Sequence, residues 1–230
     1  MTDSLHYWAV IPAAGTGVRM QAGIPKQYLS LHNKPIIEYT LDAFCNHESI
    51  SGIVVAISPQ DTYWTNLEIG CHPKIRTVDG GEERFHSVLN CLHHLQDIAS
   101  TDDWVLVHDA VRPCICKDDI DNLIMTLDGH PVGGLLAVPV RDTMKRTNES
   151  NIVCETINRD RLWHALTPQM FHLGDLTRAI EAAVEKKQII TDECQAMELI
   201  GANPVLVRGR LQNIKVTHKD DLALVELYLK

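Results

Sequence analysis

The chain has 230 residues, of which 45% are hydrophobic and 22% charged, a composition typical of a globular protein with one sizeable domain. Its net charge of −9 argues against a general nucleic-acid binder, because such proteins need a basic surface to contact phosphates. No apolar run approaches the roughly 20 residues that cross a bilayer, so we expect no membrane partner. The absence of a secretory signal and seven cysteines without paired spacing favour the reducing cytoplasm.

In the first half of the chain, short apolar runs alternate with amphipathic stretches. The runs that predict strands are Tyr7–Pro12, Ile53–Ser58, Ile75–Val78 and Trp104–His108. A glycine-punctuated turn, residues 13–20, follows the first strand. Apolar residues at helical spacing predict one helix that opens at Pro35 and another over residues 82–99.

The second half continues the alternation but contains one segment of another kind. We expect a helix capped by Asp118 or Asp119 that ends at Leu127. The other expected elements are strands at Leu135–Val140, Pro204–Val207 and Asn213–Val216, and helices at Leu173–Lys187, Thr191–Leu199 (stopped by Gly201) and Asp220–Leu229. The segment from Arg141 to Arg161 is polar and lacks helical periodicity, which indicates a hairpin or arm that leaves the main body.

Alternating strands and helices predict an α/β fold with a doubly wound, mostly parallel sheet covered on both faces. We interpret residues 1–230 as a single domain that includes the arm at about 141–161. Ligands of such sheets bind beyond the carboxyl ends of the strands. We therefore expect the turn at 13–20, the Gly80-Gly81 turn and Asp109 at one rim.

The turn after the first strand, Pro12-Ala13-Ala14-Gly15-Thr16-Gly17-Val18-Arg19-Met20, is the first candidate for a phosphate site. Small residues let the backbone approach a phosphate, and consecutive N–H groups form an anion-binding nest. The turn lacks the Gly-Lys-Ser/Thr ending of a Walker A loop. Met20 stands where a dinucleotide-binding fingerprint has its third glycine. A purely structural tight turn stays an alternative at this point.

Two cations, Arg19 and Lys26, flank this turn. Such residues in a loop are often solvated surface charges. Beside a backbone nest they instead suit a clamp on a polyphosphate, which stabilises charge on the phosphorus and its leaving group.

Two further segments follow strands. Asp79-Gly80-Gly81-Glu82-Glu83-Arg84 combines a tight turn with acids in a first helical turn, and a helix start alone would explain it. Asp109, at the end of the fourth strand, has the chemistry to hold Mg²⁺ or a sugar hydroxyl, although an Asx-type turn would also use it. Cys114-x-Cys116 has no second pair at zinc-ligand spacing.

Together these segments resemble the 2-C-methyl-D-erythritol 4-phosphate cytidylyltransferases. The run Pro-Ala-Ala-Gly-x-Gly-x-Arg-Met-x4-Pro-Lys looks like the signature of nucleotidyltransferases that act on sugar and polyol phosphates. The segments that narrow the resemblance, in chain order, are Asp79 to Val88, His108 to Pro113, Val140 to Thr143, Leu162-Trp163, Thr167 to Gln169, Ile190 to Glu193 and Asn213 to Thr217. The resemblance covers essentially the whole chain.

The resemblance implies roles for individual residues. The implied transition-state cations are Arg19 and Lys26. The implied nucleotide-binding residues are Ala13, Ala14 and Gly15, with Gly81, Glu82 and Ser87 around the base, and Asp109 and Ala110 near the ribose and the metal-bound phosphates. Those implied for the polyol phosphate are Arg159 and Lys215, which count as catalytic, then Asp109, Arg112, Thr143 and Thr191.

The resemblance also implies the partners and the wider fold. The substrates are CTP and methylerythritol phosphate, and the cofactor is Mg²⁺ or another divalent cation, held mainly by the CTP phosphates with Asp109 as the one protein ligand. The fold is a nucleotide-diphosphosugar transferase-like sheet whose protruding β-arm embraces a second subunit in a homodimer. Whether Arg159 serves its own site or the partner subunit's stays open.

Three departures from the family pattern concern details of the pocket: Val111, the pair Cys194-Gln195, and the longer acid Glu82. Three other functions remain as alternatives. One is nucleotidyl transfer to another sugar or polyol phosphate. A second is a nucleotide-diphosphosugar glycosyltransferase, which usually has an Asp-x-Asp metal-binding motif after a strand; Asp109-Ala110-Val111 does not provide one. A catalytically silent nucleotide-binding module would bind CTP without turnover.

Overall fold

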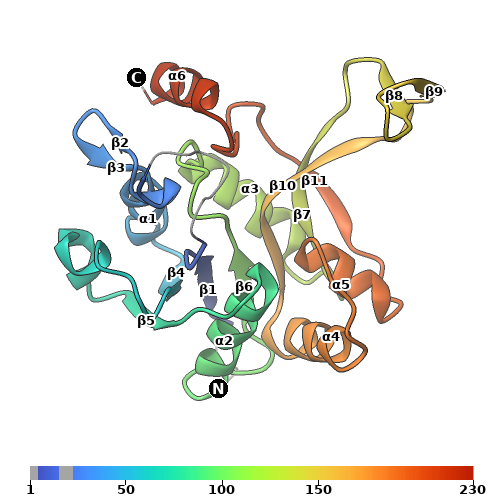
Figure 1. Cartoon of the computed structure of the whole chain (residues 1–230). Helices are drawn as coiled ribbons and strands as arrows, with labels where there is room; N and C mark the ends of the chain where they lie inside the picture. The colour runs from blue at the N-terminus through green and yellow to red at the C-terminus, as the bar shows by residue number, and fades with distance from the viewer. Residues whose placement is uncertain (1–4, 16–22, 230) are drawn as a thin grey trace.

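The computed structural model describes residues 5–15 and 23–229. Within them, a seven-stranded sheet has the order β11-β7-β10-β6-β1-β4-β5 (Figure 1). Its strands are β1 (Tyr7–Pro12), β4 (Ile50–Ile57), β5 (Ile75–Asp79), β6 (Trp104–Val107), β7 (Gly133–Pro139), β10 (Trp163–His172) and β11 (Val205–Arg208). Neighbours pair in parallel except β10, which runs antiparallel to β6 and β7. The predicted doubly wound, mostly parallel sheet is confirmed.

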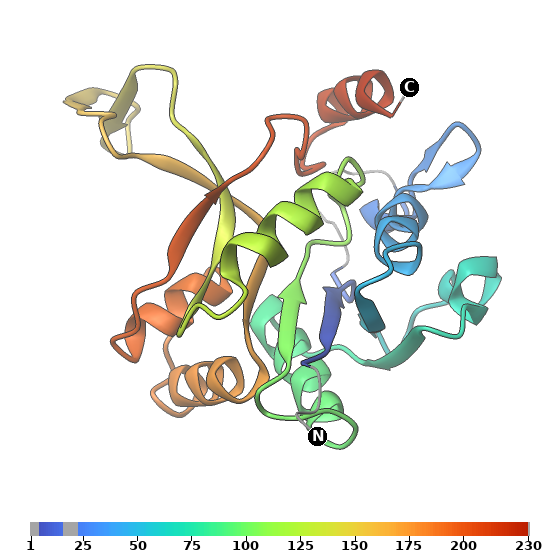
Figure 2. The same cartoon turned by 180° about the vertical axis from the view of Figure 1, so that it is seen from behind.

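Helices cover both faces of this sheet, as the two opposite views show (Figures 1 and 2). The helices against one face are α1 (Ile36–Cys45) and α3 (Lys117–Leu127), and those against the other are α2 (Arg84–Gln96), α4 (Leu173–Glu185) and α5 (Glu193–Leu199). Strand β1 shows why helices can pack on both faces. Ala9 and Ile11 are buried in the first cluster, Trp8 and Val10 in the second, because successive side chains of a strand point to opposite faces.

The body of the molecule also contains several smaller elements. They are a short hairpin of β2 (Ser30–Leu31) and β3 (Lys34–Pro35), the 3-10 turns Lys26–Tyr28, Trp64–Asn66 and Glu68–Cys71, and the last helix α6 (Lys219–Tyr228). Helix α6 packs through Val225 onto a third buried cluster that includes Val111 and Val216. Among the described residues, no helix is long and apolar enough to cross a membrane.

Most predicted elements occur within a few residues of their expected bounds. The prediction of a strand at Asn213–Val216 is wrong: these residues have no regular secondary structure, and the Asn213 and Ile214 N–H groups donate back to Arg210 O at 3.2 Å and to Gln212 O at 2.7 Å. The prediction that Asp118 or Asp119 is the N-cap of α3 is also wrong. Cys116 is the N-cap, and Asp119 at the third helical position accepts back from the Cys116 N–H at 3.3 Å.

The segment between β7 and β10 leaves the body of the molecule (Figure 1). It contains an antiparallel pair, β8 (Met144–Thr147) and β9 (Val153–Ile157), that forms its own two-stranded sheet. Most side chains of the pair are exposed, including Met144 and Val153. The expected embrace of a second subunit by this segment stays a prediction.

Candidate active site

A cavity of about 390 Å³ opens at the carboxyl ends of the central strands. Segments far apart in the sequence meet there. The predicted site residues that line it are Ala13, Ala14, Gly15, Lys26, Gly81, Glu82, Ser87, Asp109, Ala110 and Lys215. The expectation that the three motifs share one rim of the sheet therefore agrees with the structure.

Other predicted residues lie elsewhere. Arg112 is buried behind Asp109 and contacts that carboxylate without lining the cavity. Thr143 and Arg159 are exposed in the segment that carries β8 and β9, where the Arg159 guanidinium donates to Arg141 O. Thr191 is exposed before α5 and hydrogen-bonds Gln195. Arg19 falls outside the described residues.

The turn after β1 is held by a buried glutamine. The Gln27 amide donates to Ala13 O at 2.7 Å and to Gly15 O at 3.1 Å. One side chain thus fixes two carbonyl groups of the turn, immediately after Lys26 in the chain. Gln27 therefore fixes the start of this turn, residues 13–15, whereas residues 16–20 of the candidate phosphate nest lie outside the described residues.

The turn after β5 packs directly on the turn after β1. A Cβ on Gly80 would lie 2.1 Å from the Ala14 Cβ, so only glycine permits this approach. The Gly81 N–H donates to Ser87 Oγ at 3.1 Å, and Ser87 Oγ contacts Glu83 O at 3.4 Å. Ser87 therefore braces the wall of the cavity that the resemblance assigns to the base.

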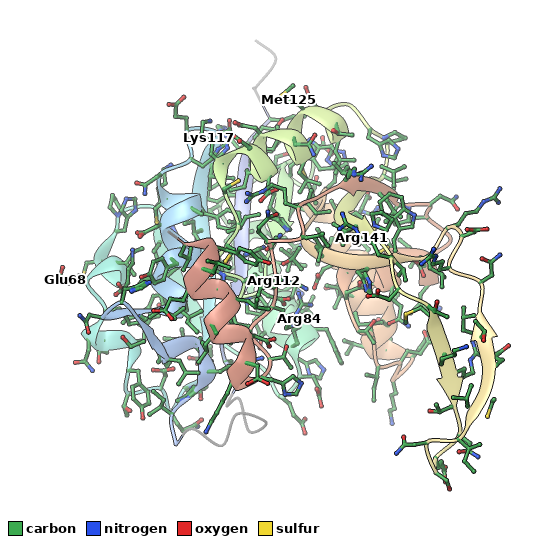
Figure 3. The ribbon with its side chains drawn as sticks, turned by 90° about the horizontal axis from the view of Figure 1, so that it is seen from above. Glu68, Arg84, Arg112, Lys117, Met125 and Arg141 are labelled. Atoms are coloured by element: carbon green, nitrogen blue, oxygen red, sulfur yellow. The ribbon has the colours of Figure 1, made fainter. Side chains whose placement is uncertain are left out.

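Asp109 is the electrostatic centre of the site. Its Oδ1 accepts from Arg84 Nε at 3.1 Å, and its Oδ2 accepts from Arg112 Nε at 3.0 Å and lies 3.0 Å from Lys215 Nζ. Arg84 and Arg112 lie together near the middle of the molecule (Figure 3). Burial alone would raise the pKa of Asp109, but Arg84, Lys215 and Arg112 lower it well below its usual range. The carboxylate is therefore ionised at neutral pH.

Behind Asp109, a buried histidine fixes the end of β6. Thr167 Oγ1 lies 2.9 Å from His108 Nδ1 and accepts from the Asp109 N–H at 3.2 Å, while His108 Nε2 lies 3.2 Å from Arg112 O. Burial lowers the pKa of His108 to about 4. The ring is therefore neutral, and its two nitrogens complete the support as one donor and one acceptor.

The two cavity lysines come from opposite ends of the chain. Lys26 Nζ donates to Val216 O at 3.4 Å, next to Lys215. The segment that carries Lys215 is anchored by Asn213, whose side chain donates to Thr167 O at 2.7 Å and whose carbonyl accepts from Arg112. An anion in the cavity would therefore meet two ammonium groups, from two segments that the Lys26–Val216 hydrogen bond joins.

Two residues of the site, Arg84 and Glu193, have no role predicted from the sequence. Arg84 begins α2 and forms a two-point ion pair with Glu193, with distances of 2.6 and 3.2 Å. A cation in a first helical turn opposes the helix dipole. An arginine at this position of the sequence therefore indicates that a nearby carboxylate compensates it. The sequence does not indicate that this carboxylate is Glu193.

Asp109 is the residue that the resemblance assigns to a divalent cation, and Glu82 and Glu83 also line the cavity. Asp109 faces the cavity, and three cations occupy part of its acceptor capacity. The described residues contain no group of three His, Cys, Asp or Glu side chains suited to a metal. Mg²⁺ commonly takes one or two carboxylates together with substrate phosphates, so the site fits this ion only when a polyphosphate supplies most ligands.

The fold is that of an α/β nucleotidyltransferase-like protein, with a candidate anion site at the carboxyl edge of its sheet. Residues 7–230 match the family described as IspD, 2-C-methyl-D-erythritol 4-phosphate cytidylyltransferase. The chain belongs to this family. It is 51% identical to the enzyme of that name from Pseudomonas fluorescens over 224 residues, which covers 96% of this chain and 95% of the relative.

Two solved structures agree with this membership. A crystal structure of 4-diphosphocytidyl-2C-methyl-D-erythritol synthase superimposes with a TM-score of 0.86 at 36% identity, covering 99% of this chain and 100% of the other. The 2-C-methyl-D-erythritol 4-phosphate cytidylyltransferase of Francisella tularensis gives 0.85 at 40% identity, with 97% and 99% covered.

Proposed function

We propose that this chain transfers the CMP group of CTP to 2-C-methyl-D-erythritol 4-phosphate. The products are 4-diphosphocytidyl-2-C-methyl-D-erythritol and pyrophosphate, in the non-mevalonate pathway of isoprenoid precursor biosynthesis. The observation that carries the proposal is the family match over residues 7–230. The convergence of Lys26, Asp109 and Lys215 on one cavity supports it independently.

The chemistry is an in-line displacement. A phosphate oxygen of the polyol phosphate attacks the α-phosphorus of CTP and forms a new P–O–P bond, while the bond to the β-phosphate oxygen breaks and pyrophosphate leaves with its electrons. The nucleophile is already an anion at neutral pH, so no general base is needed. The main barrier is the approach of two anions, which fixed cations and orientation lower.

Lys26 and Arg19 are proposed to stabilise charge that develops on the α-phosphate and the leaving group. The position of Lys26 in the cavity, next to the turn of Ala13, Ala14 and Gly15, supports its part in this role. Gly81 and Glu82, together with Ser87 in the first turn of α2, are proposed to hold the base, with Asp109 and Ala110 nearest the ribose and phosphates.

Lys215 and Asp109 are proposed to position the polyol phosphate, with Arg112, Thr143, Arg159 and Thr191 as further contacts. Lys215 is the cation best placed for the incoming phosphate, because its half-exposed side chain faces the cavity from a buried segment. A divalent cation, when bound, neutralises charge on the triphosphate. Asp109 would supply its protein ligand.

The hairpin of β8 and β9 is proposed to form a homodimer. Arg159 and Thr143 lie on this exposed segment and do not line the cavity of their own chain, which favours a contribution to the partner subunit's site. We also propose that the chain works as one nucleotidyltransferase domain in the cytoplasm. Its seven unpaired cysteines suit a reducing compartment.

The experiment that tests the proposed function is a substrate matrix. Each of the four nucleoside triphosphates is combined with methylerythritol phosphate and with sugar 1-phosphates, and the products are identified by phosphorus NMR. The proposal requires a diphosphate product from CTP and methylerythritol phosphate. A preferred product with another acceptor or base would assign the chain to another nucleotidyltransferase, and CTP binding without any product would indicate a silent binding module.

A further inference from the structure

Arg84 joins three segments around the cavity. It is the first residue of α2, Glu193 is the first residue of α5, and Asp109 follows the end of β6. The guanidinium uses two N–H groups on the Glu193 carboxylate, at 2.6 and 3.2 Å, and its Nε–H on Asp109 Oδ1 at 3.1 Å. The side chain of Arg84 therefore links Asp109, in the wall of the cavity, to the start of α5.

This contact fixes how Asp109 is oriented. Arg84 occupies Oδ1, whereas Arg112 and Lys215 both contact Oδ2. Because Arg84 binds Oδ1, the plane of the Asp109 carboxylate is fixed, and the Lys215 ammonium contacts Oδ2 alone. Without Arg84, the carboxylate would be free to turn and to hold Lys215 through both of its oxygens.

Only arginine suits this position. The Glu193 side chain is 1% exposed, and a buried carboxylate requires a cation with several donors. A planar guanidinium can satisfy two carboxylates at once, whereas a lysine ammonium is a compact point charge. Burial lowers the pKa of Arg84, but Glu193 and Asp109 raise it above the usual value.

The neighbouring turn does not depend on the Arg84 side chain. The Gly81 N–H is bound by Ser87, and Glu83 and His86 form a capping box at the start of α2. Phe85 is buried in the core. Loss of the guanidinium should therefore disturb Asp109 and Lys215 while the wall proposed for the base stays in place.

We propose that Arg84 is a positioning residue for the polyol phosphate: it holds the Asp109 carboxylate so that Lys215 is presented to the incoming phosphate. The inference rests on the proposed function, since it assigns Lys215 to that substrate. It predicts that Arg84 affects the binding of the polyol phosphate more than that of CTP, whose phosphates Asp109 is also proposed to face.

The test compares Arg84→Gln/Glu193→Gln with Glu193→Gln. Replacement of Arg84 alone would leave a buried carboxylate without its partner, whereas neutralising both residues removes that penalty. Both proteins then share a neutral residue 193 and differ in the bond to Asp109. We expect KM for methylerythritol phosphate to rise about tenfold in the double variant, the value of one charged hydrogen bond. KM for CTP should rise less, about threefold at most, because Lys215 is assigned to the polyol phosphate alone.

A second variant covers the case in which the double variant does not fold. In Arg84→Lys the ammonium can pair with Glu193 but cannot also reach Asp109, so we expect the same selective rise, about threefold or more. The matched control is Arg210→Gln/Asp119→Asn, which removes another arginine pair with a buried carboxylate, 2.9 Å apart and outside the cavity. Its two KM values should match those of the wild type.

The outcomes separate the inference from the function beneath it. Wild-type protein that makes no product from CTP and methylerythritol phosphate would overturn the proposed function. Active wild type whose Arg84 variants keep both KM values, or change both alike, would overturn the inference alone. A control whose KM values also change would overturn it too, because loss of any buried pair would then suffice.

Discussion

The ammonium group of Lys215 lies 3.0 Å from Asp109 Oδ2, so a residue near the end of the chain is held by the carboxylate at the end of the central strand β6. Lys215 has no strand of its own to position it. Its place depends on Asp109 and on the anchoring of Asn213 against Thr167 and Arg112. Lys215 is one of the three cations that contact Asp109, and it also lines the cavity.

Replacement of Lys215 by alanine should lower kcat/KM for methylerythritol phosphate about 10²–10³-fold, because one fixed cation that stabilises charge in the transition state is lost. The measurement is steady-state pyrophosphate release with each substrate varied in turn. Lys186→Ala, at the exposed end of α4, is the control and should behave as wild type. An unchanged kcat/KM in Lys215→Ala would show that Lys215 does not position the polyol phosphate.

Lys26→Ala and Arg19→Ala should each lose turnover more than CTP affinity. We expect kcat to fall about 10²–10³-fold, because these cations act mainly on charge that develops during the reaction. CTP affinity is measured by calorimetry and turnover by pyrophosphate release. Lys117→Ala, which removes an exposed pair with Asp121, serves as the control. Near-wild-type turnover in either variant would refute its assigned role.

Gly80→Ala should weaken CTP binding, because the added methyl would lie 2.1 Å from the Ala14 Cβ and force the two cavity turns apart. A rise in Kd of about tenfold corresponds to a displacement cost near 1.4 kcal/mol. Gly70→Ala is the control, since its methyl would meet Trp64 at an ordinary 3.4 Å. If both variants bind CTP like the wild type, the close packing of the turns does not shape the nucleotide site.

Buried His108 predicts a pH dependence of stability. Burial depresses its pKa to about 4, below the value of about 6.5 in the unfolded chain. As pH falls from 7 to 5, the unfolded state takes up a proton that the folded state refuses, so stability falls by about 2 kcal/mol through this residue. Urea unfolding at the two pH values should show a smaller loss for His108→Gln. An equal loss in both proteins would contradict the assignment.

Mixing two inactive variants tests whether the hairpin completes the partner subunit's site. Arg19→Ala and Arg159→Ala protomers are exchanged under mild denaturation and assayed beside each parent at the same total concentration. If Arg159 acts across the dimer, one site of each mixed dimer is intact and activity returns. No recovery, with mixed dimers verified by native mass spectrometry, would place Arg159 in the site of its own chain.

The sequence predicted the sheet and the cavity well because both depend on local patterns. Buried parallel strands appear as apolar runs, and the glycine turns with Asp109 follow them at the rim that ligands use. Ala13, Gly81 and Asp109 could therefore be placed together before any coordinates were known.

Strand β10 was missed because Pro168 lies inside it, and proline argues against a central strand. The structure accommodates it through a register shift in the pairing with β7 between Ala165 and Gln169, so Pro168 falls outside the ladder. The partners Arg84 and Glu193 were missed for a different reason. Their ion pair joins two helix starts that no local pattern relates, and only the packing of α2 and α5 on the same face of the sheet brings them together.

The most direct test of the central claim is pyrophosphate release by the wild-type protein from CTP and methylerythritol phosphate with Mg²⁺. We predict release that needs all three components and a product equal in amount to the pyrophosphate. No release from this pair, or equal release when UTP replaces CTP, would contradict the account.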